Sequence, residues 1–267
     1  MEAFFAYGFL QRALLAGVFI AIACALLGVF LILRRDAMIG HGLAHVTFAG
    51  VALGLFLNYM PLVMAMAIAV GASLIIMKLK NMAGLHGDTA IAIFSSVGFA
   101  LGVILVTLSQ SFNVDLFSYL FGEILAIEPS EVWFSIILAG VVLSLVVVNY
   151  HKFMYMTFDR ESAKASGIKV NRLDTLLTIL TAVTIVLGMK VVGILLVSAL
   201  VVIPAAAGLQ IASNFRQAML LSTAVSTISV VLGLLFAFIL DLPASGSIVL
   251  LSFLFFGLIF GFKRITR

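Results

Sequence analysis

Long apolar stretches separated by short polar intervals dominate the sequence, and this pattern predicts a bundle of membrane-spanning helices. A spanning helix needs about 20 predominantly apolar residues. The candidate segments are residues 13–33, 45–57 with a lead-in from residue 41, 61–77, 89–108, 131–149, 173–189, 191–211, 218–240 and 246–262. The second and third segments are short and either could be tilted or broken. We therefore expect eight or nine spanning helices.

The composition places the whole chain in the membrane. Hydrophobic residues make up 64% of it and charged residues 10%, whereas soluble domains carry about 25% charged residues. We therefore expect an all-α, multi-pass protein of the cell membrane, with residues 1–267 forming a single transmembrane domain. The only cysteine, Cys24, lies within the first apolar segment, which excludes a disulfide framework and a thiolate metal cluster.

The distribution of basic residues predicts the orientation. Cytoplasmic loops of membrane proteins carry an excess of lysine and arginine. With the N-terminus outside and the segments alternating, all of the 15 lysines and arginines except Arg12 and Lys190 lie on the inner side. We therefore expect the N-terminus outside and the C-terminus in the cytoplasm. Because the basic residues lie at segment ends rather than in one patch, the net charge of +4 does not indicate a nucleic-acid partner.

Two histidines, His41 and His45, lie four residues apart after the Arg34-Arg35 pair. On a helix this spacing places both imidazoles on one face, one turn apart. That is the geometry of a shared metal ion or a shared proton. At 1.5 Å per residue, His45 lies about 15 Å beyond Arg35, near mid-bilayer if the arginines mark the inner headgroups. Asp36 is a weaker candidate ligand. The alternative is one interfacial histidine and one buried histidine bonded to a neighbouring helix.

The histidine pair also resembles the zinc-protease motif H-E-x-x-H, but Gly42 occupies the position of the glutamate that acts as general base. This disfavours an intramembrane protease. No stretch fits the nucleotide-binding pattern G-x-x-x-x-G-K-[ST]. We therefore expect a transport subunit rather than an enzyme, with no permanently bound cofactor and with any ATP hydrolysed by a separate subunit.

The inner polar stretch 150–172 contains the signals of a short helix. Asp159 suits an N-cap, Glu161 lies in the first turn and Gly167 suits a C-cap. Small residues such as Ala163 would let the surface of another protein approach closely. The alternative is a solvated surface helix.

Three further features have more than one interpretation. The outer segment 109–130 has polar residues at its edges, and the apolar part between them is too short to span the membrane. We therefore expect it to lie at the outer interface. Its acidic residues Asp115 and Glu123 could form an outer gate or docking rim for a cationic substrate, or belong to an amphipathic connector. Pro204 lies within segment 191–211 and is followed by small residues, which could line a pathway or allow tight packing.

Gly98 and Gly102 form a small-xxx-small pair that could pack helices or form a dimer face.

Four runs, at residues 34–45, 88–95, 120–125 and 192–206, together resemble the permease subunit of metal-ion ABC importers, the zinc/manganese/iron uptake family of ABC-3 type. The resemblance covers nearly the whole chain. It implies a homodimeric or pseudo-dimeric permease, two cytoplasmic ATPase subunits, inward transport, and an extracellular or periplasmic protein that delivers the metal. It also implies that the helix from Asp159 to Gly167 sits in a cleft of the ATPase and couples ATP hydrolysis to transport. A bulky charged residue at Ala163 is then expected to abolish ATPase stimulation.

One position departs from the pattern of that family. The residue four before the matching histidine, His45, is usually aspartate there, and here it is His41. An imidazole in place of a carboxylate is expected to shift the preference from Mn²⁺ toward Zn²⁺. Two other transporter classes share parts of the pattern. A cobalamin or siderophore permease would be longer and lack the histidine pair. An ion-gradient-driven carrier would need an acidic residue buried in mid-helix, whereas the acidic residues here lie at segment ends.

Overall fold

Helices make up the architecture throughout the part of the chain that the structure describes. The computed structural model describes residues 7–82, 87–109, 119–122 and 127–265, and within these ranges it contains no strand. The helices are α2 (Gly8–Leu33), α3 (Met38–Phe56), α4 (Pro61–Met82), α5 (Gly87–Leu108), α7 (Pro129–Val148), α8 (Tyr150–Phe158), α9 (Arg160–Ala165), α10 (Val170–Val192), α11 (Ile194–Ile211), α12 (Phe215–Leu240) and α13 (Ala244–Ile265).

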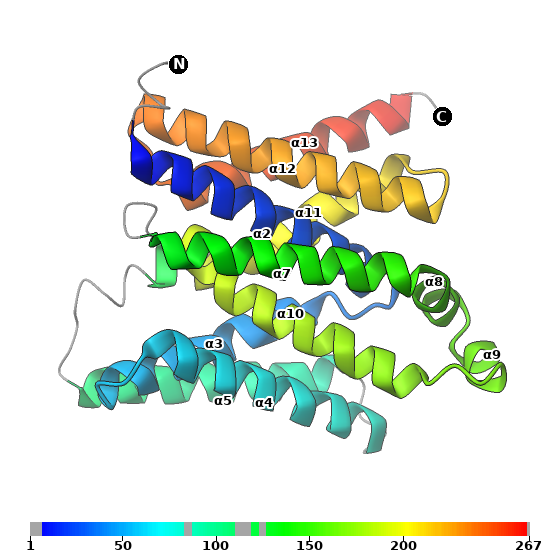
Figure 1. Ribbon diagram of the computed structural model, residues 1–267, viewed down its shortest axis with the longest axis horizontal. Coiled ribbons are helices and arrows are strands. Elements are labelled where there is room, and N and C mark those ends of the chain that lie inside the picture. Colours follow the sequence, from blue (N-terminus) through cyan, green and yellow to red (C-terminus); the bar gives the residue numbers. More distant parts are fainter. Residues whose placement is uncertain (1–6, 83–86, 110–118, 123–126, 266–267) are drawn as a thin grey trace.

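The predicted membrane bundle is confirmed. Within the described ranges, eight helices are long and apolar enough to cross a membrane, and a ninth apolar helix, Leu196–Ile211, is shorter. The two segments expected to be tilted or broken are the continuous helices α3 and α4. Helix α2 begins at one end of the bundle and α13 finishes at the opposite end (Figure 1), as an odd number of crossings requires. Which end faces the cytoplasm stays a prediction from the charge pattern.

The helices form three groups across the bundle. In Figure 1, α3, α4 and α5 occupy one side, α12 and α13 occupy the opposite side, and α2, α7, α10 and α11 lie between them. Helix α2 packs against α7, α10, α11 and α12. It is rich in buried alanines, which let these neighbours approach closely on several faces.

Close approach of α5 to α3 sets the position of the histidine-bearing helix. A Cβ atom at Gly98 would lie 2.9 Å from Cα of Val46, and one at Gly102 would lie 2.4 Å from the ring of Phe48. Only glycine leaves room for these contacts. The Gly98/Gly102 pair therefore packs helices within one chain rather than supplying a dimer face.

The boundary between α10 and α11 differs from the prediction. We expected the second of these helices to begin at residue 191, but α10 continues to Val192 and the break falls at Gly193. Gly193 has φ 84° and ψ 153°, a conformation that is essentially restricted to glycine. A Cβ atom there would also lie 2.4 Å from the carbonyl oxygen of Leu120. Helix α11 then runs without interruption through Pro204.

Candidate functional site

The two predicted metal ligands lie together on α3. Nε2 of His45 is 3.2 Å from Nε2 of His41. The rings are nearly perpendicular, at 87°, with centroids 4.6 Å apart. Helical spacing therefore produces the predicted shared face, and it also turns the two Nε2 atoms toward one another.

The surroundings of the pair are asymmetric. His41 is exposed, whereas His45 is half-buried and packs edge to face against Phe99 of α5, with ring centroids 5.2 Å apart. Nδ1 of His45 is buried and has no hydrogen-bond partner among the described residues. No described residue therefore fixes the protonation of His45 through Nδ1, and the contact of its Nε2 with His41 allows either ring to donate. The pair opens toward the surface of the bundle on the side of His41.

The distance between the two nitrogen atoms suits a shared ion. Two imidazoles bound to one tetrahedral Zn²⁺ at about 2.0–2.1 Å hold their nitrogens roughly 3.3 Å apart. The observed 3.2 Å separation also suits a hydrogen bond in which one ring donates to the other. A bound metal requires both Nε2 atoms to be unprotonated. The same geometry can therefore hold either a metal ion or a proton, as the sequence predicted.

The described residues do not complete a metal coordination shell. No group of three or more His, Cys, Asp or Glu side chains that could hold a metal occurs among them. Asp36, the weaker candidate ligand, instead pairs with Lys80 and Arg34. Four ligands are typical for Zn²⁺, so the histidine pair alone is an incomplete site.

The short helix predicted in residues 150–172 is present as α9. The side chain of Asp159 caps it by accepting a 2.9 Å hydrogen bond from the backbone N–H of Ser162. Hydrogen bonds from Ser162 lower the pKa of the Asp159 carboxyl below its ordinary value, which keeps the cap ionised. Gly167 has φ 82° after the helix, and Glu161 is exposed. The sequence missed α8, a separate helix that precedes α9.

The expectation that Ala163 lies on an accessible surface is wrong. Ala163 is fully buried and belongs to the same apolar cluster as Phe153 and Met156 of α8 and Val170 of α10. A bulky charged residue at this position would displace α9 from its neighbours, so it would test folding rather than docking. Ala165, another small residue of α9, is exposed and would let the surface of another protein approach closely.

The predicted outer residues Asp115 and Glu123 lie outside the described residues. Their role as an outer gate or docking rim stays a prediction.

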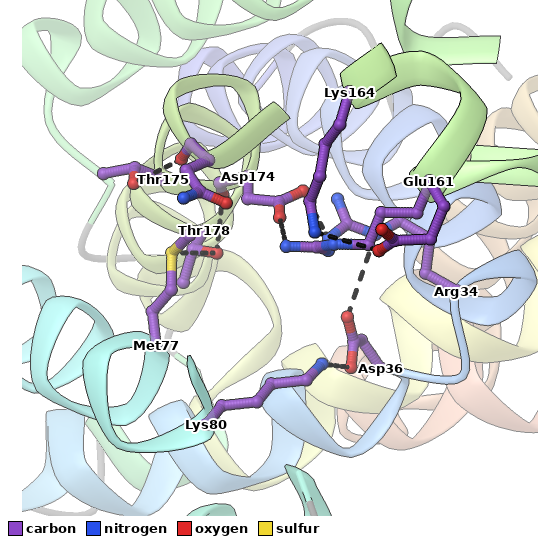
Figure 2. Close-up of polar contacts among 11 residues, drawn as sticks. Arg34, Asp36, Met77, Lys80, Glu161, Lys164, Asp174, Thr175 and Thr178 are labelled. Atoms are coloured by element: carbon purple, nitrogen blue, oxygen red, sulfur yellow. Dashed lines mark hydrogen bonds and ion pairs between the residues drawn. The ribbon is translucent and has the colours of Figure 1, made fainter. Parts of the chain in front are cut away.

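A cluster of charged residues joins the ends of α2, α4, α9 and α10 to the turn that precedes α3. Arg34 and Arg160 both contact the carboxylate of Asp174, each at 2.5 Å, and Arg34 also lies 3.8 Å from Asp36, which pairs with Lys80. We call these five residues the ion-pair chain. Figure 2 shows Lys80 and Asp36 pointing toward one another, with Asp174 on the far side of Arg34. The two carboxylate side chains are only 4% and 9% exposed, for Asp174 and Asp36 respectively.

The sequence did not reveal the ion-pair chain. In the sequence, Arg34, Lys80 and Arg160 indicate orientation, Arg34 also belongs to a run that resembles the family, and Asp174 is an acidic residue near the end of the segment 173–189. A usable signal was that Asp174 lies inside the apolar segment, one turn after the start of α10. Because an unpaired buried carboxylate is costly, such a residue predicts cationic partners.

The sequence from residue 6 to residue 263 matches the family described as the ABC 3 transport family. The chain belongs to this family. The membership confirms the resemblance noted in the sequence, and together with the apolar helices it establishes a multi-pass membrane permease of the ABC type.

Relatives and a solved structure cover nearly the full length of the chain. The manganese transport system membrane protein MntC of Listeria innocua is 33% identical over 262 residues, which are 98% of this chain and 93% of MntC. The high-affinity zinc uptake system membrane protein ZnuB of Haemophilus influenzae is 33% identical over 244 residues, which are 91% of this chain and 94% of ZnuB. A chain of PsaBC from Streptococcus pneumoniae in complex with Fab superposes with a TM-score of 0.87 at 32% identity, covering 97% of this chain and 93% of that chain.

Proposed function

We propose that this chain is the permease subunit of an ATP-driven importer for a divalent transition metal. Zinc is the preferred cargo, and manganese and iron compete with it. The observation that carries the proposal is the convergence of the His41 and His45 Nε2 atoms at 3.2 Å. Membership of an ABC permease family whose relatives include manganese and zinc transport proteins supports it.

The preference for zinc follows from the ligand type rather than from the distance. Imidazole nitrogen suits Zn²⁺, whereas Mn²⁺ favours carboxylate and water oxygen. The described residues place two imidazoles at the site and leave Asp36 in an ion pair with Lys80. A carboxylate at position 41, the usual residue in the family, would supply the oxygen that manganese favours.

A second copy of the chain completes the coordination shell in this proposal. His41 is exposed, and the neighbouring face of α5 exposes large apolar side chains, including Ile93 and Val97 at 51% and 52%. Twofold pairing of this face would bring two histidine pairs together and supply four nitrogen ligands.

Helix α9 serves in the proposal as the contact with the cytoplasmic ATPase. Its exposed residues Glu161 and Ala165 lie at the end of the bundle where the basic residues gather. An Ala165→Arg change is expected to abolish stimulation of ATP hydrolysis because the added side chain would keep the ATPase cleft from closing around α9. Ala165→Ser keeps the residue small and should retain normal stimulation. Equal stimulation in the two variants, measured in proteoliposomes, would contradict docking at α9.

Metal selectivity provides the test of the proposed function. The permease, its ATPase and its external metal-binding protein would be reconstituted, and ATP-dependent uptake of Zn²⁺ and Mn²⁺ would be measured in parallel. We expect zinc to be preferred, and the His41→Asp variant to shift the zinc-to-manganese ratio toward manganese by at least about tenfold. Preferred uptake of manganese with zinc excluded would overturn the assignment of zinc. Absence of ATP-dependent uptake of any divalent metal would overturn the function itself.

A further inference from the structure

The ion-pair chain connects the proposed ATPase contact to the helix that bears the histidines. Arg160 is the first residue of α9, and Asp174 lies in α10. Arg34 is the C-cap of α2, and Asp36 lies in the turn just before α3. Lys80 extends the connection to the end of α4. The connection therefore ends five residues before His41.

The turn that holds Asp36 is a strained and well-defined connection. Arg35 adopts φ 59°, which is uncommon for a residue other than glycine. The N–H of Asp36 donates to the carbonyl of Leu31 at 2.7 Å, and the N–H of Arg35 donates to Ile32 at 3.0 Å. These two bonds form a Schellman motif that ends α2. The N–H of Ile39, the second residue of α3, then donates to the carbonyl of Asp36, so Asp36 is bonded to the first turn of α3. A displacement of Asp36 is therefore passed directly to the start of α3.

Burial makes the ion-pair chain stiff. The carboxylates of Asp36 and Asp174 are almost inaccessible, and a buried charge that loses its partner is strongly destabilised. The partly open pocket beside them has a volume of only about 30 Å³, so little water reaches the carboxylates. Exchange of a cationic partner for water is therefore unfavourable for either carboxylate. When Arg160 moves, Asp174 must follow it or find another partner.

The charge of the cluster argues against a second metal site. Three cationic side chains surround two carboxylates, so a divalent cation would meet a net positive environment. The carboxylates and the cationic groups already form ion pairs with one another. The cluster is suited to holding elements together rather than to binding cargo.

We propose that the ion-pair chain transmits movement of α9 to α3, and so couples ATP-driven movement of the ATPase to the histidine pair. The inference rests on the proposed function, because it requires α9 to contact an ATPase and α3 to carry the metal. Its five members act as positioning residues, since none of them contacts the metal. It predicts that breaking the chain separates metal binding from ATP hydrolysis while both partial functions persist.

The test removes the first ion pair while keeping α9 folded. Arg160→Gln removes the cation that contacts Asp174, whereas Arg160→Lys retains a cation at the same position. Arg172→Gln is the matched control, because Arg172 is an exposed cation on α10, the helix that bears Asp174, and makes no ion pair among the described residues. Arg34→Gln breaks the middle of the chain, while Asp174 keeps Arg160 and Asp36 keeps Lys80. The assembled complex would be measured in proteoliposomes for bound metal, basal ATP hydrolysis, stimulation by the metal-loaded binding protein, and uptake.

We expect Arg160→Gln and Arg34→Gln to keep bound metal and basal hydrolysis but to lose stimulation and uptake by at least about fivefold, the lower range of allosteric coupling. Arg160→Lys should recover most of the loss, and Arg172→Gln should behave as the unmodified chain. Full coupling in both Arg160→Gln and Arg34→Gln, or an equal loss in Arg172→Gln, would overturn the inference while the unmodified complex still transports metal. Failure of the unmodified complex to transport any metal would instead overturn the proposed function, and this inference with it.

Discussion

Replacing His45 with alanine is expected to remove metal from the permease and to abolish uptake. His45 is the half-buried member of the pair, and its Nε2 atom lies 3.2 Å from that of His41. Loss of a ligand's supporting partner already costs 10–100-fold in metal affinity, so loss of a ligand should cost at least about 100-fold. In the proposed dimer the same change removes two of four nitrogen ligands. Metal content and identity of the purified permease, measured by elemental mass spectrometry, would show the result.

A different histidine provides the control for the His45→Ala experiment. His151 is exposed and belongs to α8, a different helix from the one that bears the histidine pair. His151→Ala removes an imidazole of equal chemistry and should leave metal content and uptake unchanged. If His45→Ala retained stoichiometric zinc and normal uptake, the histidine pair would be a structural hydrogen bond between neighbouring turns, and the cargo site would have to lie elsewhere.

The bundle was predictable because apolar runs of spanning length leave a chain few alternatives in a membrane. The histidine pair was predictable for a similar reason, since helical spacing alone puts His41 and His45 on one face. The cap at Asp159 and the positive φ at Gly167 also followed from local residue preferences. Each of these features depends on residues that are close together in the sequence.

The features that the sequence did not reveal depend on contacts between distant segments. Asp174 is paired with arginines from α2 and α9, and no local signal specifies which cations reach it. Ala163 resembles an accessible small residue until α8 and α10 cover it. Gly98 and Gly102 fit either a dimer face or an internal contact, and only the position of α3 decides between them. The break at Gly193 is set by its approach to residues 120–122, which lie about 70 positions earlier.

The largest structural effect is expected from Gly193→Ala. The conformation at φ 84° and ψ 153° is strained for any residue with a Cβ atom, at a cost of about 1–3 kcal/mol. The new methyl group would also lie 2.4 Å from the carbonyl oxygen of Leu120 and 2.5 Å from the carbonyl carbon of Phe121. These are backbone atoms that cannot rotate away, so overpacking adds about 1–3 kcal/mol. We expect a clear fall in the thermal unfolding midpoint of the purified permease.

Gly167→Ala separates the two causes of that fall. Gly167 also has a positive φ, at 82°, but a Cβ atom there would meet no heavy atom within 4 Å. It therefore carries the cost of a positive φ without the collision, and we expect it to cost about 1–2 kcal/mol. A larger fall for Gly193→Ala would show that contact with residues 120–122 holds the start of α11 in place. Because Ile194 and Val197 of α11 pack in the same cluster as Leu43 of α3, displacement of α11 should also disturb the histidine pair. Equal unfolding midpoints for the two variants would mean that strain alone limits position 193, and that the packing of α11 on this segment contributes little stability.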